Sequence, residues 1–303
     1  MDNLSEYFSV DKKVIENNNI IIFDLYRYNG EDNQLIMIYE KGMTITLHEL
    51  KIMLTYNEIY AHSKHKDTYN DLYQNIIPKD MVSFYNDISQ NINDLFDNPE
   101  SLANAKKAKE IVADMMNIII DDEFTVSSFI TILSYDYYTH THCLNVSVYA
   151  LCLGKHIGLS KDDLLNLGTS SLLHDLGKSK IDSAIINKNG KLTEGEFTEV
   201  KKHPYYGWLI AKKIGITNQD ILDGIHFHHE KVDGSGYPKG LKKDDIHLYA
   251  RIISICDAFD AISTKRTYKD SISTFNTLVL MKREMSNSFD TSLINEFIQM
   301  LRG

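Results

Sequence analysis

From Lys79 to the C-terminus, apolar residues recur mainly at the three- and four-residue spacing of an α-helix, with Ser, Asp and Asn at positions that suit helix caps. The 303-residue chain holds only 15 glycines and 4 prolines, so few turn signals interrupt this pattern. Long helical periodicity with few breakers favours packed helices over a strand-and-turn architecture. We therefore expect a mainly α protein, and at roughly 150 residues per domain the length fits about two domains.

Residues 1–75 follow a different pattern, in which short apolar runs alternate with turn signals. Two strands are predicted at Asn19–Tyr28 and Gln34–Tyr39, because turn-forming residues separate these two runs. Thr46 is expected to cap a short helix, and the residues near Glu58–His62 indicate another extended segment. We predict a small α+β N-terminal domain here, either a packing or linker module or a sensor or regulatory module.

The rest of the chain divides into a connector and a domain that carries the chemistry. Residues 76–117 are expected to form a helical connector, with one long helix over Ala103–Ile120. Residues 118–303 contain the motifs of chemical interest together with a glycine-rich loop at Asp233–Gly240. We expect residues 118–303 to be the catalytic domain.

Charge and composition exclude several classes of protein. The formal net charge is −10, which excludes a broadly basic surface for DNA or RNA polymers. No apolar run approaches the 18 residues of a membrane span, and the first 13 residues lack the apolar core of a secretion signal. Three cysteines give no disulfide framework. We expect a cytoplasmic protein that binds neither nucleic-acid polymers nor membranes.

Several metal-ligand side chains fall where the helical pattern points inward. His142 shares its stripe with Val146 and Ala150, four and eight residues further on, and Asp257 follows Ile253 by one turn. A charged Asp on an apolar stripe is costly unless it is paired or bound to a metal. Together with adjacent His-Asp and His-His pairs, these residues form a candidate metal centre: His142, His174, Asp175, His203, His228, His229 and Asp257.

Each of these residues has a structural alternative as a hydrogen-bonded core histidine or as a carboxylate paired with an arginine. Five histidines and two aspartates on inward stripes favour one shared centre over seven separate structural roles. The remaining histidines have neighbours typical of turns or solvated faces. We assign no metal role to His48, His62, His65, His140, His156, His226 and His247.

The candidate ligands lie within motifs that follow one another in a fixed order. These motifs are Asp136-x-Tyr138-Thr139-x-x-His142, His174-Asp175-x-Gly177-Lys178, His203-Pro204-x-x-Gly207, His228-His229-Glu230, Gly236-Tyr237-Pro238 and Asp257-x-x-Asp260-Ala261. The set resembles the HD-GYP family of cyclic di-GMP phosphodiesterases, which lies within the HD superfamily of metal-dependent phosphohydrolases. A Gly-Tyr-Pro loop at this distance from a His-His pair separates that family from other HD phosphohydrolases. The resemblance covers about residues 118–303.

The resemblance implies an all-helical HD-type phosphohydrolase domain with a binuclear, or in some members trinuclear, metal centre. The implied ligands form two groups that share one bridging carboxylate: His142, His174, Asp175 and Asp257 for one ion, and Asp175, His203, His228 and His229 for the other. Three-metal members carry a glutamate where this chain has Tyr138, and a tyrosine with its ordinary pKa of about 10 is a poor replacement ligand. We therefore predict two divalent ions, iron or manganese first, with nickel or zinc as alternatives.

The resemblance also implies hydrolysis of cyclic di-GMP to pGpG through a metal-bridging hydroxide, and it leaves open whether pGpG or GMP is the end product. Asp175 and Lys178 are the expected catalytic residues, with Lys178 placed to reach a nonbridging phosphate oxygen. Arg266 and Lys269 match family positions that grip the ligand phosphates. Tyr237 is expected to stack on a guanine, since every base offers a π-face.

Other functions stay open from the sequence. One is a phosphodiesterase for another cyclic dinucleotide, such as cyclic GMP-AMP, because the contacts that set specificity are not placed by sequence. Another is a non-catalytic receptor, or an interaction module that binds GGDEF-domain proteins through Gly236-Tyr237-Pro238. A homodimer is also left open. Asp260 is expected to orient a ligand histidine or Arg266, or to stabilise its helix, and Glu230 to make local hydrogen bonds.

Overall fold

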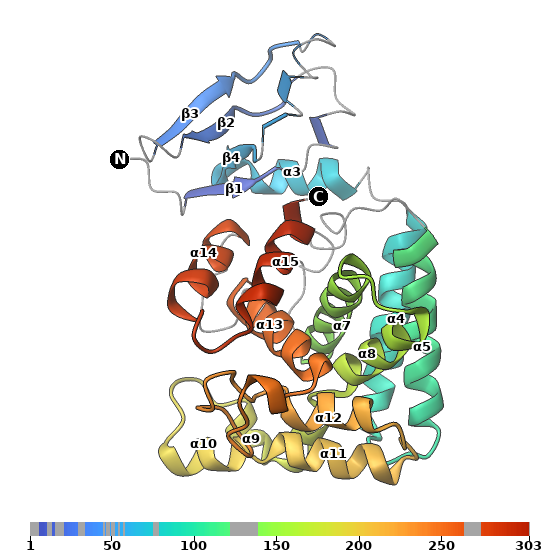
Figure 1. Cartoon of the computed structure of the whole chain (residues 1–303). Coiled ribbons are helices and arrows are strands. Elements are labelled where there is room, and N and C mark those ends of the chain that lie inside the picture. The colour runs from blue at the N-terminus through green and yellow to red at the C-terminus, as the bar shows by residue number, and fades with distance from the viewer. Residues whose placement is uncertain are drawn as a thin grey trace. The chain divides into compact units, whose positions relative to one another are not determined.

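The computed structural model divides the chain into two compact units, Met1–Phe84 and Tyr85–Gly303, each of which is described by itself. The residues that the structure describes are 6–10, 14–15, 21–29, 34–44, 46, 49, 52–53, 55–56, 58–74, 79–121, 139–263 and 274–302. Within them, the prediction of a mainly α chain is confirmed, and the strands form a small antiparallel sheet (Figure 1). The boundaries 1–75, 76–117 and 118–303 stay a prediction.

The first unit holds a four-stranded antiparallel sheet in the order β1-β4-β2-β3. Its elements are β1 (Tyr7–Ser9), β2 (Leu25–Asn29), β3 (Gln34–Tyr39), β4 (Tyr60–His62), η2 (Ser63–His65) and α3 (Lys66–Gln74). The strand expected from residue 19 begins only at Leu25, because the backbone of Ile21 is engaged outside the ladder, with Gly42 and Met43. Thr46 and Glu49 exchange capping hydrogen bonds, as a helix start requires.

The second unit is helical in the described residues. Its elements are α4 (Lys79–Asp97, which begins in the first unit), α5 (Asn104–Asp121), α7 (Thr139–His156), α8 (Lys161–Leu173), η3 (Leu176–Lys180), α9 (Ser183–Ile186), α10 (Glu194–Val200), α11 (His203–Lys213), α12 (Gln219–Phe227), η4 (Lys243–Asp245), α13 (Leu248–Ser263), α14 (Thr274–Glu284) and α15 (Thr291–Arg302). The long helix expected near residues 103–120 is confirmed as α5, which packs against α7 and α8.

Helix α8 lies among α5, α7 and α12, and small buried residues let its neighbours approach closely. The Ser147 hydroxyl on α7 donates to the Gly168 carbonyl at 3.0 Å, and the Ser170 hydroxyl donates to the Ile221 carbonyl on α12 at 2.9 Å. A Cβ on Gly224 of α12 would lie 2.1 Å from the Ser170 hydroxyl oxygen. This packing fixes the C-terminal end of α8, where the His174-Asp175 pair begins.

Aromatic rings pack α13 against α7 and α15. The ring centroid of Phe259 lies 5.2 Å from that of Tyr149 on α7 and 5.1 Å from that of Phe297 on α15, and all three rings are buried. Edge-to-face rings at such distances contribute beyond the area that they bury. Helix α13 is thereby held rigidly where its Asp257 and Asp260 face α7.

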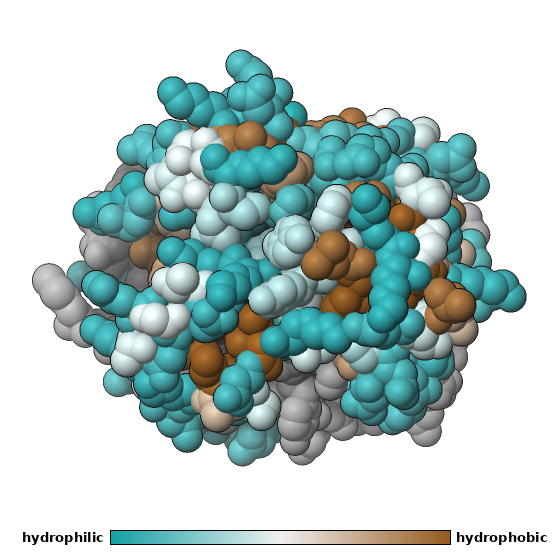
Figure 2. Space-filling model, turned by 90° about the horizontal axis from the view of Figure 1, so that it is seen from below, coloured by the Kyte–Doolittle hydropathy of each residue, from teal (hydrophilic) through white to brown (hydrophobic). Residues whose placement is uncertain are grey.

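The surface over α10, α11 and α12 is mainly hydrophilic, with separate hydrophobic patches (Figure 2). Phe197, Tyr205 and Leu209 are exposed on α10 and α11. Scattered exposed apolar side chains of this kind are ordinary in folded proteins. Among the described helices, none combines the length and the apolar content that crossing a bilayer requires.

Candidate metal centre

The seven side chains of the candidate centre converge inside the second unit, mostly from the ends of helices. His174 caps the C-terminus of α8 and is followed by Asp175, and His228 caps α12 and is followed by His229. The other three come from the first turn of α11, from α7 and from α13: His203, His142 and Asp257. Five of the seven are buried, whereas His229 and Asp257 are partly exposed, so the centre opens towards solvent on their side.

Backbone carbonyls at helix ends orient three of the imidazoles. The Nδ1 atoms lie 2.7 Å from the Ser171 carbonyl for His174, 2.8 Å from the Val200 carbonyl for His203 and 2.8 Å from the Ile225 carbonyl for His228. The last carbonyls of a helix lack an intrahelical partner, and a carbonyl only accepts. In each neutral ring Nδ1 is therefore the donor, and the unprotonated Nε2 faces the centre.

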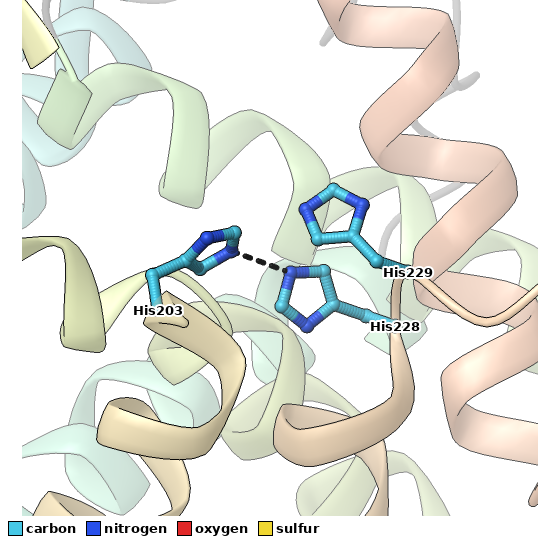
Figure 3. A group of neighbouring side chains, drawn as sticks. All are labelled: His203, His228 and His229. Atoms are coloured by element: carbon cyan, nitrogen blue, oxygen red, sulfur yellow. Dashed lines mark hydrogen bonds between the residues drawn. The ribbon is translucent and has the colours of Figure 1, made fainter. Parts of the chain in front are cut away.

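The Nε2 atoms of these three histidines lie close to one another or lack a partner among the described residues. The Nε2 atoms of His203 and His228 lie 3.2 Å apart, the contact dashed in Figure 3. Two Nε2 lone pairs at this distance repel each other when both Nδ1 atoms hold the ring protons, and a cation between them removes the repulsion. Among the described residues, the buried Nε2 of His174 has no hydrogen-bond partner. This arrangement of bare nitrogen atoms fits metal ions.

The described residues form two groups suited to a cation, and Asp175 contacts both. His142, His174 and Asp175 each offer an atom within 4.8 Å of the others, and so do His203, His228 and His229. The Asp175 Oδ1 lies 3.2 Å from the His203 Nε2, and its Oδ2 lies 3.4 Å from the His174 Nε2. A carboxylate with one oxygen towards each group is suited to bridge two ions.

Two further side chains hold His142 in place. Its Nδ1 lies 2.7 Å from Oδ2 of the fully buried Asp260, and the Asn145 amide donates to the other oxygen of Asp260 at 2.9 Å. The His142 Nε2 points instead to Asp257, whose Oδ1 is 3.1 Å away. Asp260 thus orients the histidine from behind, whereas Asp257 lies on the side of the centre. Sequence analysis missed Asn145, although it lies three residues after His142 on the same helical stripe.

The pKa values differ between the two groups. Burial lowers the pKa of His229 to about 3, and burial with the neighbouring imidazoles lowers that of His228 well below its usual value. Burial acts in the same direction on His142, but Asp257 and Asp260 outweigh it and raise its pKa to about 9. His228 and His229 therefore present neutral rings, the form that binds metals. At His142 the carboxylates stabilise positive charge, whether carried by a proton or by a metal.

Lys178 lies on η3, three residues after Asp175, and its Nζ contacts the Asp175 Oδ2 at 2.5 Å. Burial opposes ionisation of Asp175, but the Lys178 ammonium group beside it lowers the pKa of this carboxyl well below its usual range. The Lys178 side chain is partly exposed, so its ammonium group adjoins both the centre and solvent. Lys178 is thus placed at the predicted catalytic carboxylate.

The Gly-Tyr-Pro loop lies beside the second group. The Tyr237 ring stacks on the His229 imidazole with ring centroids 4.8 Å apart and an interplanar angle of 28°. Glu230 is buried and accepts hydrogen bonds from loop amides, in agreement with the local role expected for it. Tyr138, Arg266 and Lys269 lie outside the described residues.

Other histidines of the second unit make different contacts. His156 pairs with Glu296 at 3.2 Å, and His247 pairs with Asp220 at 3.3 Å. The His226 ring stacks on Trp208 with centroids 5.4 Å apart. None of these three belongs to the two metal-suited groups found among the described residues.

Comparison with known proteins identifies relatives by sequence and a solved structure with the same fold. A model described as HD domain matches residues 101–293. The chain is 30% identical over 194 residues to the cyclic di-GMP phosphodiesterase PA4108 of Pseudomonas aeruginosa, a match that covers 63% of this chain and 46% of that protein. It is 32% identical over 228 residues to the 3'3'-cGAMP-specific phosphodiesterase 3 of Vibrio cholerae, covering 72% and 49%. The chain thus spans about half the length of these curated relatives.

A solved structure also shares the fold. It is that of Bd1817, described as an HDG"Y"P protein, from Bdellovibrio bacteriovorus. The two structures superpose with a TM-score of 0.64 at 19% sequence identity, and the match covers 98% of this chain and 100% of that chain.

Proposed function

Because the chain belongs to the HD domain family, we propose that it is a metal-dependent phosphodiesterase that hydrolyses cyclic di-GMP to pGpG, with the further step to GMP left open. The observation that carries this proposal is the position of Asp175, which contacts one histidine group through each of its oxygens. Relatives named as cyclic di-GMP phosphodiesterases support the substrate class. The catalytic domain is proposed to span residues 118–303, and residues 1–75 to be a sensor or regulatory module.

Two divalent cations, iron or manganese first, are proposed to occupy the two groups. His142, His174, Asp175 and Asp257 would hold one, and Asp175, His203, His228 and His229 the other. When bound, such a pair activates water at neutral pH and neutralises charge on a phosphoryl group. The chain itself holds the ligands rigid through the Nδ1 contacts, keeps Asp175 ionised beside Lys178, and offers the Lys178 ammonium group to a nonbridging phosphate oxygen.

A second substrate is supported by the comparisons. Curated relatives include 3'3'-cGAMP-specific phosphodiesterases of Vibrio cholerae, one of them 39% identical over 133 residues. Both dinucleotides carry the same phosphodiester ring and differ at one base, so the metal centre does not separate them. A purely receptor-like role is less well supported, because the structure brings all seven ligand-type side chains together. Binding of GGDEF-domain proteins at the Gly-Tyr-Pro loop stays a prediction.

The proposal is tested by turnover of both dinucleotides. Protein purified without oxygen and loaded with iron or manganese should convert cyclic di-GMP to pGpG, measured by chromatography of the nucleotides. Side-by-side kcat/KM values for cyclic di-GMP and 3'3'-cGAMP decide the preferred substrate. Intact cyclic di-GMP with both metals would contradict the proposed activity, and tight nucleotide binding without metal or turnover would support a receptor.

We predict that the loaded protein contains two metal ions per chain. The two groups supply ligands for two ions, and the tyrosine at position 138 replaces the glutamate expected of a third site. Elemental analysis of protein purified without oxygen checks this number. Three stoichiometric ions would overturn it.

We predict that Asp260→Asn weakens metal binding without removing a ligand. The amide loses the charge that holds the His142 Nδ1 proton, so loss of this support should weaken the affinity for one ion by about 10- to 100-fold. Competition with a chelator measures the affinity of each site. The exposed Asp244→Asn provides a matched control. Equal affinities in Asp260→Asn and the wild type would show that Asp260 serves only helix packing.

A further inference from the structure

The loop that carries Tyr237 is fastened at its base. The Val232 amide donates to the Ser288 carbonyl at 3.0 Å, and the Lys243 amide donates to the Val232 carbonyl at 3.2 Å. The loop has a near arm, residues 231–236 before Tyr237, and a far arm, residues 238–243 after it. Asp233 and Lys242 form an isolated antiparallel bridge between these two arms. These contacts fix the two arms, but none of them reaches Tyr237 at the tip.

Glu230 joins the end of α12 to the far arm of this loop. The residue is 3% exposed and directly follows His229. Its Oε1 accepts the Lys239 amide at 2.6 Å, and its Oε2 accepts the Leu241 amide at 2.9 Å. Charge-assisted hydrogen bonds of this length are about twice as strong as neutral ones. Because both oxygens face backbone amides two residues apart, Glu230 is directed at the loop and not at the metal centre.

The near arm is held by a close approach of backbones. A Cβ on Gly236 would lie 2.4 Å from the Lys231 nitrogen and 2.5 Å from the His229 carbonyl oxygen, so glycine alone fits there. The Tyr237 amide donates to the same His229 carbonyl at 3.2 Å. Tyr237 is thus held on the near side by backbone packing and on the far side by Glu230.

The clamped ring faces the centre. Tyr237 stacks on His229 with ring centroids 4.8 Å apart, and His229 is one of the partly exposed members of the candidate centre. Burial raises the pKa of the Tyr237 phenol, and the carboxylates of Asp257 and Asp175 raise it further. Tyr237 and His229 are both partly exposed, so the stacked pair lies on the side of the candidate centre that opens towards solvent.

We propose that Glu230 is a positioning residue: its two backbone hydrogen bonds hold Tyr237 against His229, and through Tyr237 it sets the grip on one base of the cyclic dinucleotide. The statement about the base of the cyclic dinucleotide rests on the proposed function. Glu230 itself contacts neither substrate nor cation. A ring that is already fixed loses less freedom when a base stacks on it than a mobile ring does, so the clamp lowers KM more than it raises kcat.

Amide hydrogen exchange tests the clamp without any substrate. In Glu230→Gln one oxygen is replaced by an NH₂ group that faces a backbone N–H, so one of the two hydrogen bonds is lost. Exchange in the segment 231–243 of the full chain should speed up by about tenfold or more, with other segments unchanged. The control is Glu196→Gln, whose carboxylate also accepts a backbone amide, that of Thr193 at 2.7 Å, but lies on α10. Unchanged exchange in Glu230→Gln would overturn the clamp.

Kinetics of the loaded enzyme test the action through Tyr237. Glu230→Gln should raise KM about tenfold, change kcat by less than about threefold and keep the metal content of the wild type. Tyr237→Leu should raise KM at least as much, and the double variant should match Tyr237→Leu alone, because the clamp then has no ring to hold. Effects that multiply in the double variant, or a loss of metal in Glu230→Gln, would overturn positioning through Tyr237. If the wild type shows no turnover, the proposed function fails while the exchange result still decides the clamp.

Discussion

Asp175→Asn is expected to abolish phosphodiesterase activity, with kcat/KM falling by about a thousandfold or more. The variant keeps the size of the side chain but removes the charge, and one of its two oxygens becomes an NH₂ group. Asp175 lies between the two groups, with its Oδ1 3.2 Å from His203 and its Oδ2 3.4 Å from His174. An amide has a single, neutral oxygen and cannot offer one anionic oxygen to each of two ions, so metal content should fall from two ions to one or none.

Three measurements separate this effect from misfolding. Elemental analysis reports the metal lost, nucleotide chromatography reports the turnover, and circular dichroism reports the helical content, which should match that of the wild type. Asp244→Asn is the matched control, because this exposed aspartate lies on η4, outside the candidate centre. An Asp175→Asn variant that keeps two ions and at least a tenth of the wild-type turnover would refute a bridging role.

The sequence predicted which seven side chains lie together in the second unit, whereas their role as metal ligands stays a prediction. His142 and Asp257 share helical stripes with apolar residues, and a helix that buries its apolar stripe must bury these side chains as well. The His174-Asp175 and His228-His229 pairs lie at the C-terminal ends of α8 and α12. Helix ends of this kind bring polar side chains into the interior. The helical spacing also predicted α5 within a residue or two, since long periodic segments are the clearest signal in a sequence.

Asp260 was expected to orient a ligand histidine and contacts His142, but the other groups that orient the histidines were not predicted, because they depend on contacts between elements. The Nδ1 partner of His203 is the last carbonyl of the preceding helix α10, and that of His228 is a carbonyl in the last turn of α12. Backbone carbonyls carry no sequence signal. The Asn145 amide is fixed by Asp260, which is 115 residues away, so its role appears only once α7 and α13 pack together. The hydrogen bonds from two loop amides to Glu230 could not be predicted for the same reason.

Gly177→Ala is expected to disrupt the site, although the substitution adds only a single methyl group. A Cβ at this position would lie 2.0 Å from the His203 carbonyl oxygen and 2.4 Å from the Gly207 nitrogen. Both atoms belong to the backbone of α11, so η3 and α11 must move apart. Overpacking of this kind costs roughly 1–3 kcal/mol of unfolding free energy, and a shift of about 1 Å at the reacting groups costs about a hundredfold in turnover.

The melting temperature and kcat/KM of Gly177→Ala therefore fall together, whereas an effect on the centre alone would change only kcat/KM. For a chain of this size each kcal/mol shifts the melting temperature by about 2–4 °C. Gly195→Ala on helix α10 is the matched control, because a Cβ there meets no atom of the described residues within 4 Å. The separation of η3 from α11 also lengthens the contact between Asp175 and His203, so metal content should drop in Gly177→Ala and stay at the wild-type value in Gly195→Ala. Wild-type stability and turnover in Gly177→Ala would mean that the close approach of η3 to α11 does not determine the geometry of the centre.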